Sequence, residues 1–144
     1  MFKKDKQKVN NSNSTTLISL GTKIVGDVNF SGVLNIEGEV IGNINAVDDT
    51  SSLMISQDGK ISGDIKVPNV LINGAIEGNV YSNVFLELSS CAKINGDLFY
   101  KELKTEKGSI INGRVIFDKL DQKSNNADTV KKMKAVKVES KKSI

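Results

Sequence analysis

The middle of the chain repeats one short pattern of apolar and polar positions. Each copy reads apolar, variable, glycine, small polar or charged, apolar, and the copies begin at Ile24, Val40, Ile61, Ile76, Ile94 and Ile111. Consecutive copies are 16, 21, 15, 18 and 17 residues apart, measured between the glycines Gly26, Gly42, Gly63, Gly78, Gly96 and Gly113. A pattern that returns at such spacing predicts a repeat architecture.

A second apolar segment precedes most copies. It alternates apolar with other residues at Leu34/Ile36, Leu53/Ile55, Val70/Ile72 and Leu86/Leu88, and more weakly at Leu103/Thr105 and Ile18. Alternation with a period of two over a few residues rich in Ile and Val predicts short β-strands. Short turns rich in Gly, Asn, Asp and Ser join the two segments, because these residues reach turn conformations at low cost.

These segments together predict an all-β protein, a single-stranded parallel β-helix of about six triangular coils. Equivalent Ile and Val positions would stack between coils about 4.8 Å apart, which gives a rod about 30 Å long. The pentad glycine marks a corner where a Cβ atom would clash. The expected inward residues are Ile24, Val28, Ile36, Val40, Ile44, Ile55, Ile61, Ile65, Ile72, Ile76, Val80, Leu88, Ile94, Leu98, Ile111 and Val115. A β-sandwich of short strands is the alternative, although sandwich turns do not usually repeat one pentad.

Charge divides the chain into three regions. Residues 1–16 carry a net charge of +3, residues 17–117 carry −4, and residues 118–144 carry +4, which sum to the +3 of the whole chain. All 12 glycines lie in the middle region. The flanks are rich in Lys, Asn and Ser and poor in large apolar residues, so they cannot bury enough surface to offset the entropy of ordering. We therefore expect disordered tails at 1–16 and 118–144 around a β-helical domain at 17–117.

The composition argues against most enzyme chemistry. The chain contains no His and a single cysteine, Cys91, so it has no imidazole base, no His-ligated metal and no internal disulfide. Hexapeptide-repeat acyltransferases and gamma-type carbonic anhydrases share the β-helix, but both classes normally depend on His. We expect no catalytic, cofactor-binding or metal site. The charged N-terminus lacks the apolar region of a secretory signal, and no stretch of 18 apolar residues occurs, so we expect a cytoplasmic protein.

The two ends of a β-helix pose a physical problem. Each end exposes backbone hydrogen-bonding groups and an apolar cross-section, which natural solenoids usually cover. The sequence shows no amphipathic capping helix. Uncapped ends could stack on other subunits. The candidate polymer-interface residues are then Leu17, Ile18 and Leu20 at the first coil and Val115, Ile116 and Phe117 at the last coil. End contacts that do not close produce filaments, and the alternative is that tail segments cap the ends.

The pentads, with Leu34-Asn35-Ile36-Glu37-Gly38 and Val70-Leu71-Ile72-Asn73-Gly74, resemble the bactofilin family over about residues 15–117. The resemblance implies a right-handed parallel β-helix with disordered termini that polymerises without nucleotide into filaments, bundles or sheets. It also implies a cytoskeletal scaffold that localises cell-wall enzymes or other partners and so influences cell shape. The chain departs from the pattern at Thr105, where an aliphatic residue is expected.

The first four residues, Met1-Phe2-Lys3-Lys4, are similar to the short membrane-targeting peptide of many bactofilins. Phe2 can enter the headgroup boundary, while each nearby Lys attracts anionic lipid with about 1 kcal/mol. A filament presents many copies of the peptide, and avidity multiplies weak single contacts. The resemblance thus implies peripheral association with the inner face of the membrane, and an ordinary solvated N-terminus is the alternative.

The C-terminal region carries a run of positive charges. Its last lysines are Lys131, Lys132, Lys134, Lys137, Lys141 and Lys142. Such a run can bind phosphates in a salt-dependent manner, but it lacks aromatic residues that would stack on bases. The pattern favours a solubilising or partner-docking tail over a nucleic-acid binder. The alternative function is a capped β-helical binding module whose basic tail binds nucleic acid or a partner protein.

Overall fold

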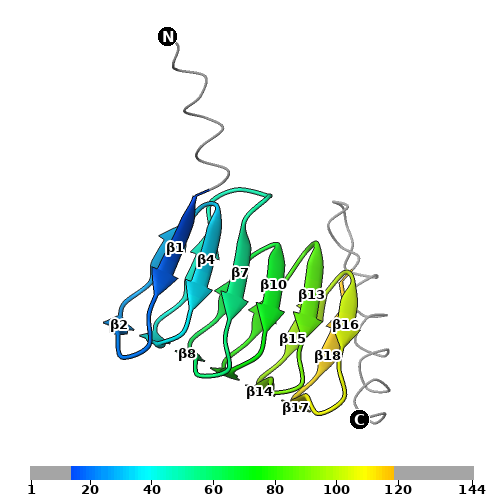
Figure 1. Cartoon of the computed structure of the whole chain (residues 1–144). Coiled ribbons are helices and arrows are strands. Elements are labelled where there is room, and N and C mark those ends of the chain that lie inside the picture. Colours follow the sequence, from blue (N-terminus) through cyan, green and yellow to red (C-terminus); the bar gives the residue numbers. More distant parts are fainter. Residues whose placement is uncertain (1–13, 119–144) are drawn as a thin grey trace.

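The structure is a computed structural model that describes residues 14–118. Within this range the chain forms short strands and no helix, and it winds as a parallel β-helix of six coils (Figure 1). The predicted fold is confirmed. Strands extend from Thr15 to Phe117, and the greater part of the two predicted tails lies outside the described residues.

Each coil contributes one strand to each of three parallel sheets, here called sheets A, B and C. Sheet A faces the viewer in Figure 1 and contains β1 (Thr15–Ile18), β4 (Val33–Ile36), β7 (Ser52–Ile55), β10 (Asn69–Ile72), β13 (Phe85–Leu88) and β16 (Leu103–Thr105). Sheet B contains β2 (Lys23–Val25), β5 (Glu39–Ile41), β8 (Lys60–Ser62), β11 (Ala75–Glu77), β14 (Lys93–Asn95) and β17 (Ile110–Asn112). Sheet C contains β3 (Val28–Phe30), β6 (Ile44–Ala46), β9 (Ile65–Lys66), β12 (Val80–Tyr81), β15 (Leu98–Tyr100) and β18 (Val115–Phe117).

The core is a set of aliphatic columns that run along the inside of the rod. All the predicted inward residues are buried except Ile24, Val28 and Ile111, which are half-buried. These three belong to the first and last coils, where a neighbouring coil covers them on one side only. Thr105 occupies the inward position opposite Leu88 but is exposed, so the departure noted in the sequence falls on the terminal coil.

The pentad glycines form the corner between sheets B and C. Gly42, Gly63, Gly78 and Gly96 have φ between +151° and +156°, a conformation that L side chains rarely adopt. The column is also closely packed, because a Cβ atom at Gly63 would overlap the carbonyl oxygen of Gly42 in the preceding coil. The predicted steric reason for glycine at this corner is therefore confirmed.

The polar residue after each glycine forms a hydrogen-bonded ladder. In each of the first five coils its side-chain oxygen accepts a hydrogen bond of 2.9–3.0 Å from the backbone N–H of the equivalent residue in the next coil. The members are Asp27, Asn43, Asp64, Asn79, Asp97 and Arg114. The ladder explains why Asp and Asn dominate this position, since both carry an acceptor oxygen, Oδ1, two bonds beyond Cβ.

One corner departs from the regular coil. Residues 47–51 form a five-residue connection between β6 and β7, which contributes to the long interval between Gly42 and Gly63. Asp48 organises this segment by accepting hydrogen bonds from the Ser51 hydroxyl at 2.7 Å and from the Thr50 backbone and hydroxyl. These bonds, that of Ser51 foremost, lower the pKa of Asp48. The segment bulges from the side of the rod.

Candidate assembly interfaces

The first coil exposes apolar side chains at one end of the rod. Ile18 is 6% exposed and packs into the core, whereas Leu17 is 53% exposed on the outer side of sheet A. Leu20, in the turn after β1, is 66% exposed. The three predicted residues therefore lie in one coil but point in different directions. Val25 in β2 is 74% exposed and was not predicted, although it is an apolar residue at the variable position of its pentad.

The last coil presents a different surface. Val115 and Ile116 are buried, and Phe117 is half-buried with its ring 5.7 Å from that of Tyr100. Burial raises the pKa of the Tyr100 phenol. The three predicted residues are the whole of β18, the terminal strand of sheet C. This end is thus apolar but more covered than the first.

The hydrogen-bonded ladder also distinguishes the two ends. At the first coil no described residue accepts a hydrogen bond from the backbone N–H of Asp27, because this coil is the first within residues 14–118. At the last coil Arg114 replaces Asp or Asn, and its guanidinium turns back to bind both carboxylate oxygens of Asp97, at 3.3 and 2.8 Å. Asp97 raises the pKa of Arg114 through this hydrogen bonding and through its charge. The ladder therefore ends at Arg114, which offers no side-chain acceptor to a following coil.

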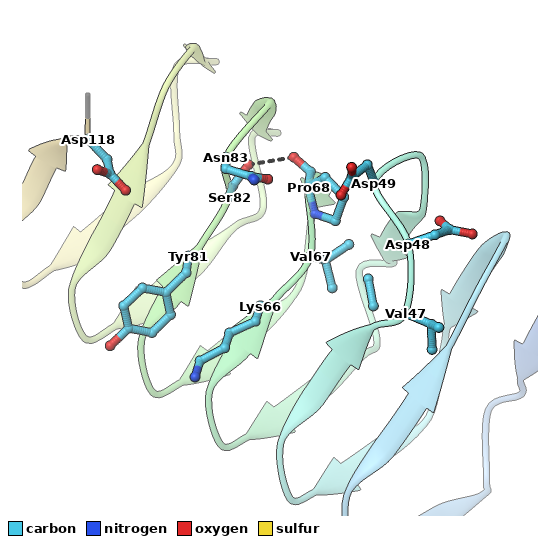
Figure 2. A pocket seen from close by; sticks show the side chains of 11 residues that line it. Val47, Asp48, Asp49, Lys66, Val67, Pro68, Tyr81, Ser82, Asn83 and Asp118 are labelled. Carbon is cyan, nitrogen blue, oxygen red and sulfur yellow. Dashed lines mark hydrogen bonds between the residues drawn. The ribbon is translucent and has the colours of Figure 1, made fainter. Parts of the chain in front are cut away.

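A groove of about 500 Å³ lies on the side of the rod, beside the bulging segment 47–51 (Figure 2). It is lined by Asp48, Asp49, Lys66 and Tyr81, among others. The Tyr81 ring is stacked on Phe99 with centroids 4.7 Å apart, and Lys66 Nζ lies 5.6 Å from its centroid. Both faces of Tyr81 are therefore occupied, which leaves no aromatic platform for a ligand.

Other chemical features are sparse in the described range. Residues 14–118 contain no group of three or more His, Cys, Asp or Glu side chains placed to hold a metal ion. No helix in the same range is long and apolar enough to cross a membrane. The peptide implicated in membrane targeting, Met1, Phe2, Lys3 and Lys4, lies outside the described residues.

Comparison with known proteins agrees with the architecture. Residues 16–116 match the family model for bactofilin, described as polymer-forming cytoskeletal. Bactofilin BacO of Myxococcus xanthus (strain DK1622) is 31% identical over 109 residues, which span 72% of this chain and 84% of that relative. No solved structure was found to match. The six-coil rod and these two matches agree, and the chain belongs to the bactofilin family of polymer-forming cytoskeletal proteins.

Proposed function

We propose that this polymer-forming protein assembles without nucleotide by end-to-end stacking of its β-helices. The observation that carries the proposal is the exposure of apolar side chains at the first coil, where Leu20 and Val25 face solvent beside an open edge of the core. Among the described residues, β1, β2 and β3 each have a sheet neighbour on one side only. A second rod placed against this end would extend the sheets and bury the apolar edge.

The last coil supports the proposal through its composition. The aliphatic columns continue into β18 through Val115, and the half-buried Phe117 beside it is the side chain that a docked partner would contact. A heterologous or alternating contact between such ends gives an open filament, because neither closes into a ring. The polymer is a scaffold in this proposal, and no catalytic role is assigned to the chain.

A capped binding module is the second candidate, and the burial of Val115 and Ile116 favours it. Both side chains are about 5% exposed although they lie in the terminal strand. If this end is already covered, Phe117 stabilises the subunit rather than the contact between subunits. The basic tail would then serve to bind nucleic acid or a partner protein. Melting and filament formation of the Phe117 variant separate the two candidates.

We also propose that the polymer lies on the inner, cytoplasmic face of the membrane and positions cell-wall or cell-shape proteins there. The support is the sequence Met1-Phe2-Lys3-Lys4, which joins one aromatic side chain to adjacent positive charges. Each Lys near an anionic surface contributes about 1 kcal/mol, so one peptide binds weakly and a filament binds through many copies.

Replacing Phe2 with glutamate should abolish sedimentation of the polymer with anionic liposomes. The substitution removes the apolar anchor and adds a charge that anionic lipid repels. The measurement is co-sedimentation with vesicles that contain phosphatidylserine. Phe2→Trp is the matched control and should still sediment, because tryptophan also favours the membrane interface. Undiminished sedimentation of the glutamate variant would remove the membrane proposal without affecting end-to-end assembly.

A further inference from the structure

The outer side of sheet A is uncharged through four coils. Two columns of side chains point outward from it, and they alternate with the two inward columns along each strand. One column contains Leu17, Asn35, Met54, Leu71, Glu87 and Lys104, and the other contains Thr15, Val33, Ser52, Asn69 and Phe85. The first charged residues are Glu87 and Lys104, which form an ion pair of 3.8 Å at the far end. We call the outer surface of β1, β4, β7, β10 and β13 the A face.

The A face combines apolar with mostly uncharged polar side chains, and it is shallowly grooved. Met54 is 39% exposed near its centre, and Leu71 and Phe85 are half-buried beside it. Grooves of about 270 and 200 Å³ border Met54 and Leu71 on the two sides. Among residues 14–118, Asn35 Oδ1 is the buried side-chain atom without a hydrogen-bond partner. Rotation of that amide toward a facing surface would let it meet a donor, which buried acceptors normally have.

Sheet B shows that this surface is not a general property of the coil. The outward positions of sheet B include five charged residues of both signs, Lys23, Glu39, Lys60, Glu77 and Lys93. The two sheets have the same backbone pairing and the same number of strands. The difference therefore lies in side-chain chemistry. Sheet B carries mixed charges along most of its length, as an ordinary solvated surface does, whereas sheet A carries them only at its far end.

We propose that the A face packs against the A face of a second copy of this chain in a neighbouring filament. The inference rests on polymer formation. Five strands about 4.8 Å apart and about 13 Å long cover roughly 300 Å², whereas a stable dimer buries about 800 Å² on each partner. Two isolated rods would therefore pair weakly. Two filaments repeat the contact at every subunit, so the weak contacts add along their length.

The chemistry of the face selects this occupant over a membrane. An anionic lipid surface attracts Lys and Arg, and the first four coils of the A face contain neither. A surface on which apolar side chains are interspersed with Asn, Ser and Thr suits an identical surface, which offers the same mixture of apolar contacts and donors. Like faces meet about a two-fold axis. Met54, near the centre of the face, would then lie close to the Met54 of the facing copy.

The first test combines Met54→Lys with Leu71→Lys. Both side chains point outward, so the rod should fold and form single filaments. Charge repulsion across the contact should abolish the side-by-side pairing of filaments that the proposal predicts for the natural protein. The measurement is electron microscopy of the polymer, with circular dichroism melting as the check of folding. The matched control is Ile41→Lys on sheet B, which should leave pairing intact. Should the double variant not fold, Met54→Gln with Leu71→Gln tests the same face without added charge.

The second test is cysteine crosslinking in a Cys91→Ser background. Met54→Cys should give disulfide-linked dimers under conditions of polymerisation, and Ile41→Cys should not. Bundles that persist in the double lysine variant, or crosslinking at Ile41 in place of Met54, would overturn the proposal. If the double lysine variant lost liposome binding while its bundles persisted, the A face would bind lipid, and the proposal would be wrong. If the double lysine variant formed no filaments but kept its melting temperature, the A face would belong to the end-to-end contact, which also contradicts the proposal.

Discussion

Replacing Gly63 with alanine should destabilise the rod severely and lower its melting temperature by about 10 °C or more. The Cβ atom would overlap the carbonyl oxygen of Gly42, and it would meet that residue's carbonyl carbon at 2.5 Å. These are backbone atoms inside a column of stacked coils, so they cannot move without disturbing the pairing of β5 with β8. Overpacking of this kind costs about 1–3 kcal/mol, and the positive φ adds about 1–3 kcal/mol.

The expected loss is large relative to total stability. Natural domains are stable by about 5–15 kcal/mol, and about 1 kcal/mol shifts the melting temperature of a 100-residue domain by about 4–8 °C. Circular dichroism melting at low protein concentration measures the effect.

Gly26→Ala is the control that isolates the packing contribution. Gly26 also has a positive φ, +134°, but no atom lies within 4 Å of a Cβ placed there, since it belongs to the first coil of the described residues. It should therefore show only the conformational part of the loss. Equal melting shifts for the two alanine variants would contradict the stacking explanation of the glycine column.

Replacing Phe117 with arginine should prevent filament formation while leaving a folded subunit. The side chain ends β18, and a charge carried into an apolar contact between subunits costs several kcal/mol when it finds no partner. A cost of about 3 kcal/mol raises the concentration needed for assembly by about a hundredfold. Sedimentation of the polymer over a concentration series measures this change.

Melting distinguishes an interface from a cap in the same variant. If Phe117 contacts a neighbouring subunit, the variant should melt close to the natural protein when both are monomeric. If Phe117 covers its own end, the variant should lose stability along with its contact to Tyr100. Val47→Arg is the control, because Val47 is an exposed apolar residue on the side of the rod. Filaments at the natural concentration in the Phe117 variant would contradict the interface assignment.

The sequence predicted the interior of the rod better than its surface. Inward positions such as Ile61 and Ile76 recur at fixed distances from a pentad glycine, so a single periodic signal identifies both coil and core. Burial at the ends followed a different rule. Ile24 and Ile111 have the same pattern but are half-buried, because exposure there depends on the absence of a further coil rather than on local sequence.

The surface features depend on register between coils, which a linear pattern does not display. Leu71 lies between Val70 and Ile72 in the sequence and resembles one more core residue, yet it points outward beside Met54. The ladder after the glycines was visible as a preference for small polar residues. Its role depends on a contact between coils: the side chain of Asp64 accepts a hydrogen bond from the backbone N–H of Asn79, 15 residues later.

The most direct test of end-to-end assembly is electron microscopy of the purified full-length protein without nucleotide. Six coils about 4.8 Å apart make a subunit about 29 Å long. We therefore expect unbranched filaments with an axial subunit repeat near that length and a continuous strand spacing of about 4.8 Å. Discrete particles of one or a few subunits at every protein concentration, in physiological salt, would contradict end-to-end assembly.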